Sequence, residues 1–124
     1  MKILIDENDS MPNYQQIILQ IKRLIIIGDL KPNEQLPSIR NLAKDLNVAI
    51  ITIKRAYEEL EKDGITYTLG GKGVYIKEID PNNLKLDLIT NIKGQFKEVI
   101  ALAKYLNLSN EEILASFKEE LFNE

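Results

Sequence analysis

Three short helical patterns and one hairpin pattern follow one another closely along the chain, and this order limits the folds open to it. Apolar residues recur every three or four positions over 14–27, over 50–62, and in the segment that Ser38 begins and Asn47 ends. Two β-prone runs within 65–77 flank a glycine-rich turn and predict a hairpin. Three helices and then a hairpin, with few residues between the second and third helices, are typical of a winged helix-turn-helix. We therefore predict a mainly α fold with a small β-hairpin.

Two polar residues are expected to fix the ends of the second helix. The hydroxyl of Ser38 can accept a hydrogen bond from a free backbone N–H of the first turn, so Ser38 is the predicted N-cap. Asn47 tolerates the left-handed backbone conformation that a tight turn between two helices requires. Together they predict a short second helix that turns sharply into the third.

A polar break, Asp80-Pro81-Asn82-Asn83, follows the predicted hairpin. We place a domain boundary here, with a winged helix-turn-helix over residues 1–79 and a helical tail over residues 80–124. Beyond the break, apolar residues alternate by three and four positions and predict a coiled-coil-like seam on one long helix. The seam consists of Ile89, Ile92, Phe96, Val99, Ala103 and Leu106. A capping box formed by Ser109 and Glu112 then predicts a second, shorter helix.

The two tail helices carry more apolar surface than they can bury against each other, because Leu84, Leu86 and Leu102 lie off the seam. One interpretation is that these helices cover the N-terminal domain. The other, which we favour, is that they pair with the same helices of a second chain. The usual closed arrangement of this kind is a two-fold homodimer. The seam is therefore the predicted dimer interface.

The composition argues against an enzyme. The chain has no cysteine and no histidine, which excludes thiolate or imidazole zinc sites, a Cys–His dyad and a Ser-His-Asp triad. The glycines of 70–73 lie between strand-like segments and do not open a helix, so they do not form a phosphate-binding loop. We expect no cofactor.

The sequence also bears on location and partners. No apolar run approaches the roughly 18 residues of a membrane helix, and the N-terminus does not look like a signal peptide, so we expect a cytoplasmic protein. The net charge is −3, but residues 1–79 carry equal numbers of basic and acidic side chains, and the excess acid lies in 80–124. The N-terminal part can therefore present a basic face to nucleic acid.

Residues 11–77 carry a specific resemblance to a known family. The resemblance rests on Leu36-Pro37-Ser38-Ile39-Arg40-Asn41-Leu42-Ala43, Leu46-Asn47-Val48, Thr52-Ile53-Lys54-Arg55-Ala56-Tyr57 and Leu60-Glu61-Lys62-Asp63-Gly64. Upstream Pro12-Asn13-Tyr14-Gln15-Gln16-Ile17 and downstream Gly71-Lys72-Gly73-Val74-Tyr75-Ile76 extend it. These stretches resemble the GntR family of bacterial transcriptional regulators. The short two-helix tail further resembles its YtrA-like subfamily.

The resemblance implies a set of DNA-binding residues. Ser38 and Arg40 would meet the DNA backbone and groove edge, Thr52 and Lys54 would reach phosphates and bases in the major groove, and Gly71-Lys72-Gly73 would approach the minor groove. The charge pattern agrees, because the third helix is basic in its first half and acidic in its second, which suits end-first insertion into a groove. Arg55 has two interpretations of equal weight, a DNA contact or an i, i+4 ion-pair partner of Glu59.

One segment departs from the family pattern. The family that this chain resembles usually has three polar residues after the Val of the turn, whereas this chain has Ala49, Ile50 and Ile51. Helical spacing places Ile51 away from the core and Ile50 at the leading tip of the third helix. We include both in the predicted DNA-binding surface, with thymine methyl groups as their hypothetical contacts.

The sequence thus predicts a sequence-specific repressor that binds double-stranded DNA as a homodimer. YtrA-like regulators often control neighbouring transporter operons, so such an operon is an expected target. A non-specific or architectural DNA binder, and a winged helix that serves only as a protein-interaction module, are the alternatives. The sequence identifies no small-molecule effector.

Overall fold

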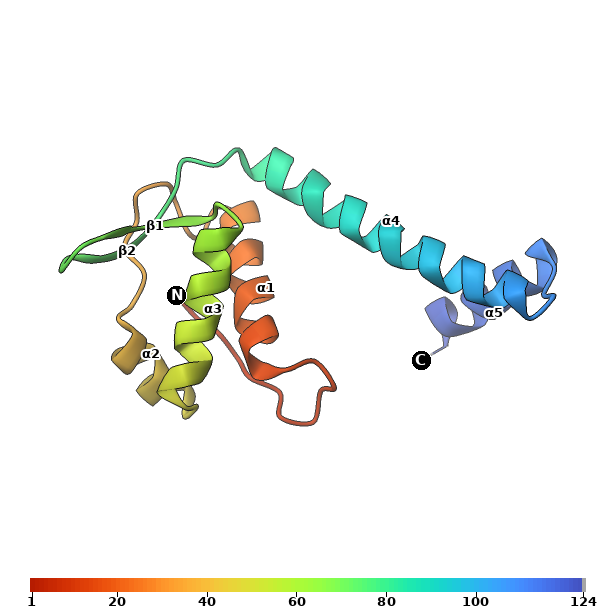
Figure 1. Ribbon diagram of the computed structural model, residues 1–124, viewed down its shortest axis with the longest axis horizontal. Helices are drawn as coiled ribbons and strands as arrows, with labels where there is room; N and C mark the ends of the chain where they lie inside the picture. Colours follow the sequence, from red (N-terminus) through yellow and green to blue (C-terminus); the bar gives the residue numbers. More distant parts are fainter. Residues whose placement is uncertain (124) are drawn as a thin grey trace. The chain divides into compact units, whose positions relative to one another are not determined.

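The computed structural model describes residues 1–123 and contains seven helices and strands within them (Figure 1). They are α1 (Asn13–Ile26), α2 (Ile39–Leu46), α3 (Ile50–Lys62), β1 (Thr66–Leu69), β2 (Gly73–Ile76), α4 (Pro81–Tyr105) and α5 (Asn110–Phe122). The predicted mainly helical fold with one small hairpin is confirmed. The chain divides into two compact units, Met1–Lys85 and the part from Leu86 onward.

The first unit is built around one apolar core. Ile17 and Ile21 of α1 are completely buried, as are Ile53 and Leu60 of α3 and Ile76 of β2. Figure 1 shows α1 and α3 side by side, with α2 at one end of α3 and the hairpin at the other. Each helix contributes one apolar stripe at helical spacing, so the packing follows from the pattern in the sequence. Leu84, in the first turn of α4, belongs to the same core.

Both predicted ends of α2 are confirmed. The Ser38 hydroxyl accepts a hydrogen bond from the backbone N–H of Asn41 at 3.2 Å. Asn47 has a φ of 54° and turns the chain into α3 within three residues. The hydroxyl of Tyr57 donates to the carbonyl oxygen of Pro37 at 2.7 Å and ties the start of α2 to α3. Burial raises the pKa of Tyr57, so its hydroxyl keeps its proton and remains a donor.

The hairpin is antiparallel, with Thr66 opposite Ile76 and Leu69 opposite Gly73. The rings of Tyr67 and Tyr75 stack across it with their centroids 5.5 Å apart. The segment before α2 lies beside β2, because Gln35 forms an isolated antiparallel bridge with Tyr75. The wing is therefore attached to the segment that leads into the helix-turn-helix.

An extended N-terminal segment, residues 1–6, lies along α1 and buries Ile3 in the core. Two glutamines of α1 hold it in place. The Gln20 side chain accepts from Leu4 N at 2.9 Å and donates to Leu4 O at 2.6 Å. The buried Gln16 side chain makes the same pair of bonds with the backbone of Asp6, each at 2.9 Å. One turn of helix thus offers this segment the hydrogen bonds that a strand edge would offer.

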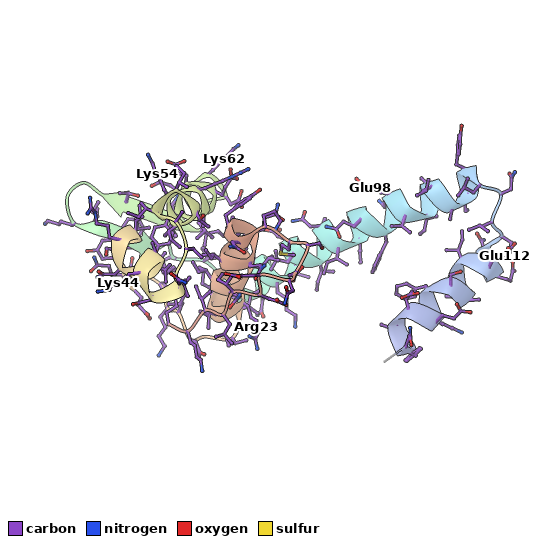
Figure 2. All side chains as sticks on the ribbon, turned by 90° about the horizontal axis from the view of Figure 1, so that it is seen from below. Arg23, Lys44, Lys54, Lys62, Glu98 and Glu112 are labelled. Atoms are coloured by element: carbon purple, nitrogen blue, oxygen red, sulfur yellow. The ribbon has the colours of Figure 1, made fainter. Side chains whose placement is uncertain are left out.

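The second unit consists of the rest of α4 followed by α5. The predicted capping box is confirmed, since Ser109 accepts from Glu112 N at 3.1 Å and Glu112 accepts from Ser109 N at 3.2 Å. The rings of Phe96 and Phe117 meet edge to face with their centroids 5.9 Å apart. The described part of this unit has no buried residue, and its side chains stand out on all sides in Figure 2. None of the helices within residues 1–123 is both long enough and apolar enough to span a membrane.

Candidate nucleic-acid interface

The helix-turn-helix presents unpaired basic side chains to solvent. Arg40 on α2 and Lys54 on α3 are both exposed, and Figure 2 shows Lys54 projecting from the outer side of α3. Among residues 1–123 the single ion pair joins Lys22 and Asp63 at 3.2 Å. Arg40 and Lys54 therefore keep charges that no carboxylate compensates, which suits contact with phosphates.

The first turn of α3 carries the unusual apolar pair. Ile51 is 68% exposed, so the expectation that it points away from the core is confirmed. Ile50 is the first residue of α3, as expected, and is 51% exposed. Ala49 occupies the N-cap position and supplies no side-chain hydrogen bond. Thr52 is half-buried behind them, and its backbone N–H donates to Ala49 O at 3.0 Å. The first two residues of α3 are therefore apolar, and its polar side chains begin at Thr52.

Arg55 lies against an aromatic ring. Its guanidinium carbon is 3.8 Å from the centroid of the Tyr14 ring, at the start of α1. It forms no ion pair with Glu59 within 4.0 Å, so the ion-pair interpretation of Arg55 does not describe this structure. Arg55 and Tyr14 share an open groove between the beginnings of α1 and α3. The groove is lined by Pro12, Asn13, Tyr14, Ile51, Thr52 and Arg55, none of which is acidic.

The wing has a backbone geometry that only glycine adopts easily. Gly71 and Gly73 have φ values of 73° and 117°, in the left-handed region that other residues rarely enter. The backbone N–H of Lys72 donates to Leu69 O at 2.9 Å and closes the turn. A Cβ at position 73 would lie 2.5 Å from Nε2 of Gln35, whose side chain donates to Lys72 O at 2.9 Å. Two hydrogen bonds thus brace the wing tip, and the Lys72 side chain is exposed.

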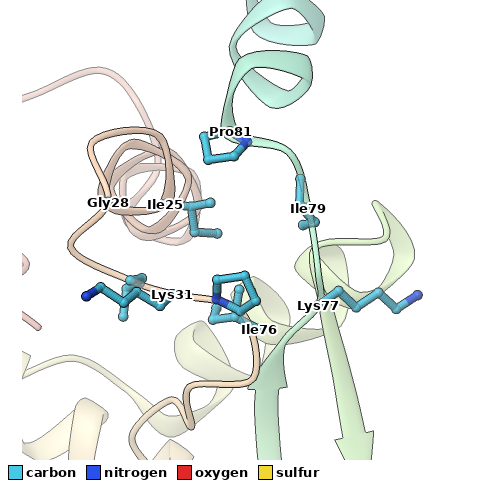
Figure 3. A pocket seen from close by; sticks show the side chains of 9 residues that line it. Ile25, Gly28, Lys31, Ile76, Lys77, Ile79 and Pro81 are labelled. Carbon is cyan, nitrogen blue, oxygen red and sulfur yellow. The ribbon is translucent and has the colours of Figure 1, made fainter.

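The described residues form neither a metal site nor a polar ligand pocket. They contain no group of three or more side chains that could hold a metal ion. A second hollow of about 220 Å³ lies where α1 and β2 end and α4 begins, lined mainly by Ile25, Leu30, Ile76, Ile79 and Pro81 (Figure 3). Lys31 and Lys77 flank it with their ammonium ends directed away. The hollow is therefore apolar, with no polar group converging on a ligand.

Two contacts beside this surface were not predicted from the sequence. Tyr14 was part of the resemblance, yet its contact with Arg55 joins residues 41 positions apart and leaves no periodic signal. Gln35 carries no signal in the sequence analysis, and its bond to the wing spans 37 positions. A polar residue in extended sequence just before the second helix would have been the cue for Gln35.

Comparison with known proteins gives a consistent result. The sequence pattern of the bacterial regulatory proteins of the gntR family matches residues 13–76. The chain is 41% identical over 117 residues to the HTH-type transcriptional repressor YtrA of Bacillus subtilis (strain 168), covering 94% of this chain and 90% of that protein.

Solved structures agree with the sequence comparison. A GntR family transcriptional regulator from Listeria monocytogenes is 35% identical with a TM-score of 0.65, covering 90% of this chain and 97% of that one. The DNA-binding domain of AraR in complex with operator ORX1 is 25% identical with a TM-score of 0.54, covering 61% of this chain and 95% of that one. The family consists of transcriptional regulators, which are not enzymes. The chain therefore belongs to the GntR family of bacterial regulatory proteins, as a winged helix-turn-helix DNA-binding regulator of transcription similar to YtrA.

Proposed function

We propose that the protein is a repressor that binds a specific operator in double-stranded DNA as a homodimer and acts in the cytoplasm. Repression is supported by the similarity to YtrA, which is named as a repressor. DNA binding at the helix-turn-helix is supported by the exposed, uncompensated Arg40 and Lys54 and by the glycine-containing wing. With the family resemblance and the positions on α2, α3 and the wing, we assign the DNA contacts to Ser38, Arg40, Ile50, Ile51, Thr52, Lys54, Arg55 and Gly71-Lys72-Gly73.

One observation carries the homodimer. The seam residues Phe96 and Val99 are 46% and 63% exposed, and large apolar side chains of α5 such as Leu121 are exposed as well. An apolar surface of this extent in a protein free in water marks an interaction site. A second copy of the same helices is the partner that offers a matching apolar face, and a two-fold axis closes the assembly. Two winged domains would then bind two half-sites of one operator.

The decisive experiment selects bound sequences from a random DNA pool and compares their affinity with that of unrelated DNA at several salt concentrations. A sequence-specific regulator keeps its preference for the selected DNA as salt rises, while non-specific binding falls steeply. Equal loss on both DNAs would favour an architectural binder, which the apolar tip of α3 makes the second candidate. A protein that binds no DNA even at low salt would instead be an interaction module.

We also assign the operator to the neighbourhood of a transporter operon. The support is the resemblance to YtrA-like regulators. Mapping the bound sites in the genome tests this assignment separately, since it can fail while operator binding stands.

A further inference from the structure

The contact between Arg55 and Tyr14 joins the recognition helix to the start of α1. An arginine side chain on a helix surface is normally free to sample many rotamers, and that freedom is lost when it binds a phosphate. Here the guanidinium already lies over a ring, 3.8 Å from its centroid. Part of the ordering that DNA binding requires is therefore present before DNA arrives.

The ring under Arg55 is itself fixed. Tyr14 is half-buried and packs against the apolar core of the first unit. Its hydroxyl accepts a hydrogen bond from the side chain of Gln15 at 3.2 Å. The ring thus has one side against the protein and offers the other to the guanidinium.

A ring differs from a carboxylate in what it leaves free. Glu58 and Glu59 follow Arg55 by three and four positions, where a helical ion pair could form, yet neither comes within 4.0 Å of it. A carboxylate would occupy the N–H donors of Arg55 and cancel its charge. The face of a tyrosine ring attracts the cation but leaves the N–H groups at the edge of the guanidinium available for a phosphate.

The surroundings of Arg55 suit the same ligand. The groove that it lines with Tyr14, Ile51 and Thr52 is open to solvent and contains no acidic side chain. Ile51 and Thr52 are two of the residues assigned above to the DNA surface, so Arg55 lies at the edge of that surface. A phosphate of the DNA backbone is the anion that this position would meet.

We propose that Tyr14 is a positioning residue for DNA binding, whose ring holds the Arg55 guanidinium ready to contact a backbone phosphate. This inference rests on the proposed DNA-binding function. In this proposal Tyr14 contacts no DNA atom and affects DNA binding only through Arg55.

The test is a double-mutant cycle on the full chain, measured as affinity for the selected operator. Arg55→Ala should weaken binding about tenfold and lower the salt slope by about one, as expected for one lost phosphate contact. Tyr14→Leu should weaken binding about threefold, and Tyr14→Phe, which keeps the ring, should bind like the wild type. In the Arg55→Ala background, Tyr14→Leu should cost nothing further. Tyr105→Leu, at an 86% exposed tyrosine in the second unit, is the matched control.

Three results would overturn the inference. These are Tyr14→Leu binding like the wild type, Tyr14→Leu losing the same factor with and without Arg55, and Tyr14→Phe losing as much as Tyr14→Leu. The second would make Tyr14 a purely structural residue, and the third would assign the effect to its hydroxyl. Thermal unfolding of each variant checks that the domain is folded. A wild-type protein that shows no preference for any selected DNA contradicts the proposed function instead, and the two failures are therefore distinct.

Discussion

The two units of the chain use similar apolar residues in opposite ways. In the first unit, Ile17, Ile53 and Leu60 are fully buried. In the second unit, Val99 and Leu106 are each 63% exposed. Three helices and a hairpin can enclose a core, whereas two helices leave their apolar faces open to water. The first unit thus encloses a core of its own, while the second exposes apolar faces that need a partner surface to become buried.

The contrast between the two units is tested most directly at the seam of α4. Replacing Phe96 and Val99 together by Asp places two charges on the face that we assign to the dimer. We expect monomers by light scattering, and a loss of operator affinity of about 10²–10⁴-fold, because the two half-sites are no longer bound by one linked molecule. Glu98→Ala on the same helix, outside the seam, should remain dimeric. A double mutant that stays dimeric would show that the seam only packs within one chain.

A core substitution in the first unit tests its independence. Ile53 is fully buried, so Ile53→Ala should lower the free energy of unfolding by about 2–5 kcal/mol through lost contacts and a cavity. The loss should be the same at low and high protein concentration. Val99→Ala in the second unit should instead have an effect that depends on concentration, since it weakens association. Denaturant unfolding at two protein concentrations, followed by circular dichroism, measures both; two concentration-independent losses would contradict the contrast.

The exposed polar surface of the first unit should matter for binding and little for stability. Arg40→Ala is expected to weaken operator binding by about 1–3 kcal/mol while changing the stability by no more than about 0.5 kcal/mol. Arg23→Ala, an exposed cation near the end of α1, serves as the matched control and should bind normally. Titration of labelled operator DNA measures the difference. If Arg40→Ala binds like the control, Arg40 is not a contact residue.

Ile50 and Ile51 are the exception within α3, because they are apolar and exposed where the other large apolar residues of this helix are buried. If they read thymine methyl groups, replacing single thymines of the operator by uracil should cost the wild type about 1 kcal/mol at one or more positions. The Ile51→Asn variant should be indifferent to the same replacement. Uracil substitutions that cost both proteins equally, or cost nothing, would remove this role.

Local features of the fold were predictable from the sequence, and contacts between distant segments were not. The Ser38 cap, the turn at Asn47 and the capping box at Ser109 depend on neighbours within four residues, so residue types alone identify them. The exposure of Ile51 followed from helical periodicity. The Tyr14–Arg55 contact was different, because it depends on how α1 packs against α3. Periodicity shows which face of each helix is buried, but not which side chains meet at the edge of the interface.

The hydrogen bonds from Gln16 and Gln20 to the first residues of the chain have a consequence for where the folded domain begins. The recognisable family region starts at Asn13, but Ile3 and Leu84 lie outside that region and are buried in the same core. A fragment cut to the family match, residues 13–76, would leave both glutamine side chains without their backbone partners and open the core at two places. Sequence families are defined by what relatives share, whereas a stable fragment needs every segment that covers its core. In this chain, the segments that cover the core extend beyond the family match at both ends.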